Sequence, residues 1–127
     1  MSKSDFLEQK VLDHVLINTA YASPVTVYVG LFTTVLQDDG SGTEVSGNAY
    51  ARRPVTFSRA GSVCTNSAEA TFAVATPGNW GLLVSFGVYD AATAGNLLYH
   101  GAISPTKTVN VGDAARFAIG QLSVIEN

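Results

Sequence analysis

The sequence predicts a mainly β protein: an antiparallel β-sandwich, of jelly-roll or immunoglobulin-like type, preceded by a short N-terminal α-helix. Three observations support this prediction. The chain has 127 residues, close to the commonest size of one domain. Hydrophobic residues recur at every second position in many short segments. Turn-forming residues separate these segments, as in sandwiches and not in alternating strand–helix units. With no linker or internal repeat, we expect one domain over residues 1–127.

Residues 5–18 are predicted to form the helix. Asp5 can cap the first turn, and Leu7, Val11 and Val15 recur every four residues, which places them on one face. An isolated helix of this length is marginal in water, so its apolar face must pack on something. The sequence leaves open whether that is the chain's own sheet or a neighbouring subunit.

Strands are expected after Pro24, where the hydrophobic period changes from about 3.6 to about 2. A Gly- and Asp-rich stretch at 37–47 is predicted to be a surface loop. Pro54 favours a sheet edge or a bulge, and a turn at 90–95 joins its two flanking strands into a hairpin. The predicted strands are residues 25–32, 50–58, 68–74, 82–89, 96–103, 107–111 and 115–124.

Composition and charge exclude several classes of partner. The seven Lys and Arg residues are scattered and the net charge is −3, so no basic stripe for nucleic acid exists. No apolar run approaches the length of a membrane span, and the N-terminus lacks the apolar core of a signal peptide. Only 13% of residues are charged, which favours a surface that is covered by partners.

Few residues suggest chemistry, and we predict no catalytic, cofactor or metal residues. His14 and His100 lack the spacing of a metal pair, and Cys64 has no catalytic signature around it. The acidic residues of the 37–47 loop are of the type that binds calcium, but the Asp-x-Asp-x-Asp-Gly spacing is missing. Trp80 is interpreted as a core anchor in preference to a sugar-stacking platform.

Arg52 and Arg53 form the one local basic cluster. Adjacent strand residues point to opposite faces, so the two cannot hold a single anion. They are either in surface salt bridges, or one of them docks on an acidic partner. The candidate partner-binding residues are therefore Leu7, Val11, Val15, Arg52 and Arg53.

Six segments carry a resemblance to a known family, in the same order and spacing. They are 27–34 (VYVGLFTT), 42–52 (GTEVSGNAYAR), 80–81 (WG), 86–91 (FGVYDA), 95–99 (GNLLY) and 109–113 (VNVGD). The chain resembles small tailed-bacteriophage virion proteins, a family often labelled phage tail fiber protein. A β-sandwich with an adhesive helix is also similar in architecture to phage head decoration, or cement, proteins.

The resemblance implies a virion structural protein, made in the bacterial host cytoplasm. We expect a dimer or trimer, because a small subunit on a particle gains from multivalent contact. The main hypothesis is a capsid decoration subunit that binds the major capsid protein and stabilises the particle. The alternative is a tail-associated or tail-fibre subunit that contacts tail proteins, with glycan binding through exposed Tyr, Trp and the long loop. A small envelope hydrolase is the third hypothesis, and the absence of a nucleophile–base or paired-carboxylate pattern argues against it. The sequence thus predicts a protein that is not an enzyme.

Overall fold

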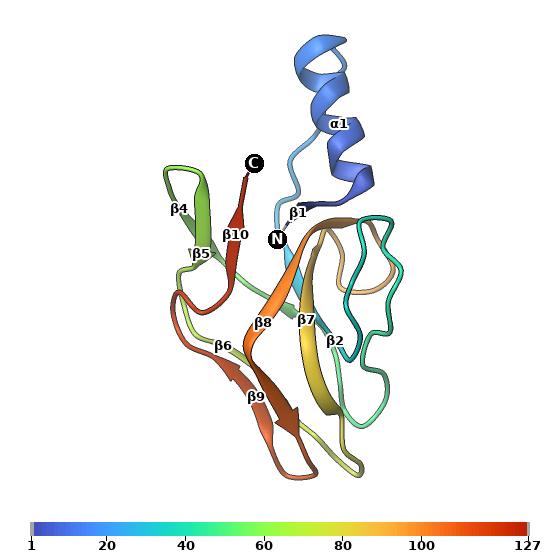
Figure 1. The fold of residues 1–127 in the computed structure, drawn as a ribbon, viewed down its shortest axis with the longest axis vertical. Helices are drawn as coiled ribbons and strands as arrows, with labels where there is room; N and C mark the ends of the chain where they lie inside the picture. The colour runs from blue at the N-terminus through green and yellow to red at the C-terminus, as the bar shows by residue number, and fades with distance from the viewer. Residues whose placement is uncertain (1, 127) are drawn as a thin grey trace.

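The computed structural model describes residues 2–126. Its elements are β1 (Ser2–Lys3), α1 (Asp5–Leu16), β2 (Tyr28–Phe32), β3 (Arg53–Pro54), β4 (Phe57–Ala60), β5 (Val63–Asn66), β6 (Ala70–Val74), β7 (Gly81–Tyr89), β8 (Leu97–Val109), β9 (Ala114–Phe117) and β10 (Ser123–Ile125). The predicted class, mainly β with antiparallel sheets and a short N-terminal helix, is confirmed, and the arrangement is sandwich-like (Figure 1).

Three sheets share one hydrophobic core. The strand orders are β1-β8-β7-β2-β3, β10-β5-β4 and β6-β9. Val29 and Phe86 of the five-stranded sheet belong to the same buried cluster as Phe72 and Phe117 of the two-stranded sheet and Val124 of β10. The rings of Phe72 and Phe117 meet edge to face, 6.0 Å apart. This core fixes the sheets against one another.

The predicted hairpin forms the centre of the largest sheet, but its second strand is longer than expected. β8 continues from Leu97 to Val109, so the predicted strands 96–103 and 107–111 are one strand. Pro105 lies within this strand. The register between β7 and β8 shifts in this region, between Leu83 and Ser85, which lets β8 pass a residue that cannot donate to the ladder.

Two other predicted strands are divided. The segment 50–58 contributes Arg53 and Pro54 to the edge of the five-stranded sheet, and β4 then begins in another sheet. The segment 115–124 is split into β9 and β10, separated by a turn at Gly120, whose φ is +83°. β5 was missed, because residues 61–66 read locally as a loop.

The helix begins as predicted at Asp5 and ends two residues early, at Leu16. Its N-cap is Ser4 and not Asp5: the Ser4 hydroxyl accepts from the Leu7 amide at 3.1 Å and donates to the Leu97 carbonyl. The cap therefore also ties the helix to β8. Within residues 2–126 the longest helix has 12 residues, and none is long and apolar enough to cross a membrane.

Candidate interaction surface

Helix α1 is anchored at its first turn and then leaves the β body (Figure 1). The Ser4 amide donates to the Leu98 carbonyl at 2.8 Å, and the Asp5 amide donates to the Asp38 carbonyl at 2.9 Å. Leu7 is the buried residue of the helix, only 6% exposed. The base of the helix is thus part of the fold, whereas its later turns stand away from the sheets.

The returning chain covers one side of α1. Tyr21 packs edge-on against Phe6 with ring centroids 6.4 Å apart, and its amide donates to Nδ1 of His14 at 3.3 Å. The Thr19 amide donates to the Asp13 carbonyl at 3.0 Å. These contacts fix the helix and leave its opposite side uncovered by the chain itself.

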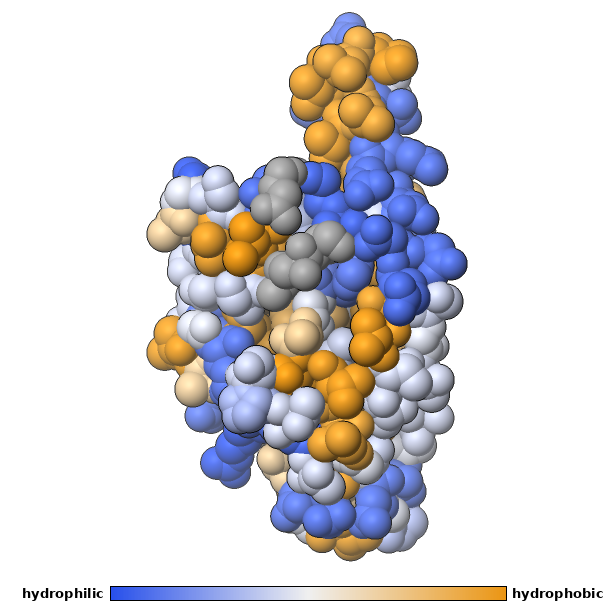
Figure 2. All heavy atoms as spheres, in the orientation of Figure 1, coloured by the Kyte–Doolittle hydropathy of each residue, from blue (hydrophilic) through white to orange (hydrophobic). Residues whose placement is uncertain are grey.

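That opposite side is hydrophobic and exposed. Its residues are between 38% and 73% exposed, and Figure 2 shows hydrophobic atoms gathered at the projecting end of the helix. We call this surface the apolar helix face: Val11, Leu12, Val15, Leu16 and Ile17. Full burial of such a side chain contributes about 1.5–3 kcal/mol, so covering all five would contribute on the order of 5 kcal/mol or more. Contiguous apolar surface of this kind is typical of interaction sites.

The structure divides the predicted helix residues between two roles. Val11 and Val15 lie on the exposed face, as the prediction requires. Leu7 does not, because its side chain is buried in the chain's own packing. Leu12 and Leu16 were not among the predicted partner-binding residues, although the same four-residue period places them on the helix surface.

A groove of about 550 Å³ opens beside the base of α1. It lies between the sheet that contains β8 and the sheet of β10, β5 and β4, which Figure 1 shows standing apart at the end nearest the helix. Its walls are mainly apolar: Leu7, Val27, Phe57, Val88, Leu98 and Val124. Cys64, half-buried in β5, also lines it.

The two rims of the groove carry different charges. On the β4 side, the exposed Arg59 donates to the Gly61 carbonyl at 2.9 Å. On the other side, Glu126 pairs with Lys3 and accepts from the Tyr99 hydroxyl at 2.6 Å. Desolvation opposes ionisation of Glu126, but these hydrogen bonds outweigh it and lower the pKa of the carboxyl. The negative charge of Glu126 is therefore compensated within the chain.

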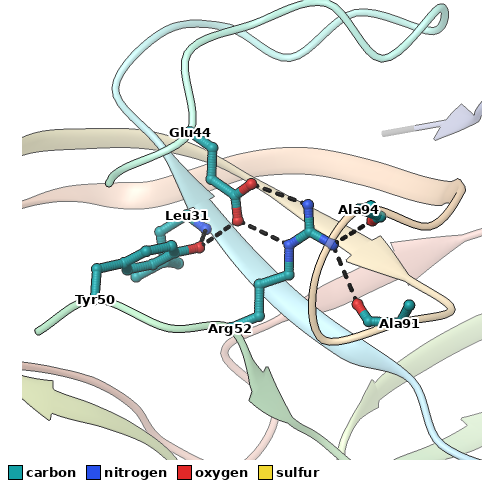
Figure 3. Close-up of polar contacts among 6 residues, drawn as sticks. All are labelled: Leu31, Glu44, Tyr50, Arg52, Ala91 and Ala94. Atoms are coloured by element: carbon teal, nitrogen blue, oxygen red, sulfur yellow. Dashed lines mark hydrogen bonds and ion pairs between the residues drawn. The ribbon is translucent and has the colours of Figure 1, made fainter. Parts of the chain in front are cut away.

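A second cluster of polar residues lies at the loop that follows β2 (Figure 3). Glu44 accepts from Nε and Nη2 of Arg52 at 2.8 and 2.9 Å and from the Tyr50 hydroxyl at 2.6 Å. The same hydroxyl accepts from the Leu31 amide at 2.9 Å. Gly30 makes room for this network, because a Cβ there would lie 2.6 Å from Oε2 of Glu44.

Arg52 also fastens the turn between β7 and β8. Its Nη1 donates to the Ala91 and Ala94 carbonyls at 3.1 and 2.7 Å, and its guanidinium lies 3.6 Å from the ring centroid of Tyr89. The side chain is 9% exposed. Arg52 is thus engaged inside the fold and presents little surface to a partner. Arg53 is exposed on β3, and its docking on an acidic partner stays a prediction.

Alkaline pH should weaken the fold through Tyr50. Burial, followed by the hydrogen bond to Glu44, raises the pKa of its hydroxyl well above the ordinary value of 10. Because the folded-state pKa is the higher one, the contribution of Tyr50 is fully present below about pH 10 and is lost as the pH rises further. We expect the free energy of unfolding, measured with urea, to fall above that value, with Tyr50 contributing about 1 kcal/mol per pH unit. Burial also raises the pKa of Tyr89 and of Tyr99, which adds to the slope. Tyr50→Phe should reduce this slope by the contribution of Tyr50. An unchanged slope would contradict a raised pKa of Tyr50 in the folded protein.

The other residues considered for chemistry have structural partners. In the acidic loop, Oδ1 of Asp39 accepts from the Ser41 amide at 2.9 Å, and Asp38 lies 2.6 Å from Nε2 of His100. No group of three or more His, Cys, Asp or Glu side chains in residues 2–126 is placed to hold a metal ion. Trp80 is buried and its indole donates to the Asn48 carbonyl at 2.8 Å, which confirms it as a core anchor.

A match to a family model over residues 2–125 makes this chain a structural protein of a phage virion. The model is described as Podophage GP4 fiber I protein gp80, and the chain belongs to that family. The resemblance inferred from the six sequence segments is confirmed. A search of curated proteins found no match. Of the two functions predicted from the sequence, the family supports the tail-fibre alternative better than capsid decoration.

Proposed function

We propose that this protein is a structural subunit of the phage fibre and that the apolar helix face makes its assembly contact. One observation carries the proposal: α1 projects from the body with one side covered by Tyr21 and the returning chain and the other side hydrophobic and exposed. A helix that presents such a face commonly inserts it into an apolar groove of a partner. Binding would act by mass action, since burial of the face lowers the free energy of the assembled particle.

The contacts of the acidic residues support a binding role and not catalysis. A hydrolase needs a carboxylate or a nucleophile–base pair that faces substrate. Here Glu44 is engaged by Arg52 and Tyr50, and Asp90 accepts from the amide and side chain of Asn96 at 2.7 and 3.0 Å. Glu126 is likewise held by Tyr99. These carboxylates stabilise loops and strand ends.

Loss of the apolar helix face should remove the protein from virions. The double substitution Leu12→Asp/Leu16→Asp places two charges on the face, and we expect at least tenfold less protein per particle when the variant complements a gene deletion. Incorporation is measured by quantitative mass spectrometry of purified virions. These substitutions are preferable to deleting residues 1–18, because the deletion also removes Ser4 and Leu7, which pack within the fold.

The matched control is Thr106→Asp/Thr108→Asp, which adds the same charge at exposed positions of β8, outside the apolar helix face. It should incorporate normally, and both variants should unfold at the wild-type urea concentration. Normal incorporation of Leu12→Asp/Leu16→Asp would overturn the proposal. Gold-labelled antibody on intact virions locates the subunit: label on tails is expected, whereas label spread over heads would favour decoration instead.

A further inference from the structure

We propose that the apolar helix face of one copy seats in the groove of a second copy of this chain. The inference rests on the proposed function and names the partner of the same face. The chain carries two apolar surfaces, the exposed apolar helix face and a groove of about 550 Å³. The apolar helix face does not reach the groove of its own molecule. Ser4 and Leu7 hold the base of α1, and the later turns of the helix point away from the body (Figure 1).

The groove has enough volume for several aliphatic side chains. From Val11 to Ile17 the apolar helix face extends about 9 Å along the helix axis. A groove of this volume is within the range of about 300–1,000 Å³ that encloses ligands the size of several side chains. Both surfaces are mainly apolar, so their contact would exclude water from both at once.

Charge complementarity points to a second copy as the occupant. Glu8 is exposed one turn before Leu12, beside the apolar helix face, so a docked helix carries its carboxylate to the rim of the groove. Arg59 stands exposed on one rim, whereas Glu126 on the other is already compensated by Lys3. The groove thus offers a cation where the docked helix brings an anion.

Exchange of helices gives a closed assembly. If α1 of each copy enters the groove of the other, the two contacts are equivalent, as in a two-fold dimer. Neither an apolar helix face nor a groove is then left exposed. In a ring of three copies, α1 of each copy would enter the groove of the next, and the same contacts would form. Either arrangement places Glu8 of one copy next to Arg59 of another.

A charge-exchange experiment tests this contact in the purified full-length protein. Light scattering coupled to size exclusion should give two or three times the chain mass of 13.3 kDa. Glu8→Arg and Arg59→Glu should each weaken association at least tenfold, because each places like charges together. An equimolar mixture of the two variants should associate again, because in a mixed dimer each helix meets the opposite charge in its partner's groove. In a mixed ring of three, two of the three contacts pair opposite charges. A contact within one chain cannot respond to mixing.

Glu69→Arg is the control, a change of charge as large as that of Glu8→Arg at an exposed residue that lines neither surface, and it should leave the mass unchanged. A wild-type mass of 13.3 kDa across the micromolar range, or no recovery on mixing, would overturn the inference. If Leu12→Asp/Leu16→Asp still lost its place in the virion, a different virion protein would be the partner and the proposed function would stand. A loss of self-association and a loss of incorporation into virions can therefore be distinguished.

Discussion

Replacement of Asn66 with alanine is expected to lower the free energy of unfolding by about 3 kcal/mol or more. Asn66 ends β5 and has no exposed surface. Its Nδ2 donates to the Ala68 and Ala118 carbonyls at 2.9 and 3.0 Å and reaches the Phe117 carbonyl at 3.4 Å. Its Oδ1 accepts from the Leu122 amide at 2.9 Å. Alanine would leave these backbone groups without their partner, and the buried ones could not turn to water.

Urea unfolding at neutral pH measures this loss. Asn110→Ala is the control, because Asn110 is exposed after β8, and it should remain within about 0.5 kcal/mol of the wild type. Asn66→Asp should also be destabilised, since it keeps the acceptor but loses the donor and buries a carboxylate. A wild-type unfolding midpoint for Asn66→Ala would show that the connection from β9 to β10 is held by other contacts.

The role of Asn66 could not be predicted from the sequence, and the reason is physical. The residues around it, Thr65 and Ser67, have the composition of a turn, and its partners other than Ala68 follow more than fifty positions later. Helix α1 and the β7–β8 hairpin were predictable because their signals are local, a period of residues and a turn. β5 and the division of residues 115–124 depend on contacts that form only when the sheets meet.

The interaction surface was partly predictable for the same reason. The four-residue period placed Val11 and Val15 on one helix face, but it could not tell that Leu7 would be buried at the base. Which side of α1 remains open depends on Tyr21 of the returning chain, a contact that no local pattern indicates. The groove is formed by strands from distant segments, so no sequence signal marked it.

The different roles of Arg52 and Arg53 could not be told apart from the sequence either. Substitution of Arg52 is the second change that we expect to reduce stability strongly. Arg52→Ala should lower the free energy of unfolding by about 3 kcal/mol, close to the range for removing one partner of a buried pair. The substitution leaves the carboxylate of Glu44 without its bidentate partner. It also removes the donor to the Ala94 carbonyl and the cation that stacks on Tyr89. Arg53→Ala, one residue later and exposed, should cost at most about 0.5 kcal/mol.

A double-mutant cycle separates the ion pair from the other contacts of Arg52. Much of the cost of Arg52→Ala should come from the stranded charge of Glu44, so Arg52→Ala/Glu44→Ala should cost less than the sum of the single substitutions. Additive costs would mean that Arg52 acts mainly through the turn between β7 and β8. Equal costs for Arg52→Ala and Arg53→Ala would contradict the network altogether. In the expected case Arg52 stabilises the loops that follow β2 and β7, and thereby the sheet whose strand β8 anchors the base of α1.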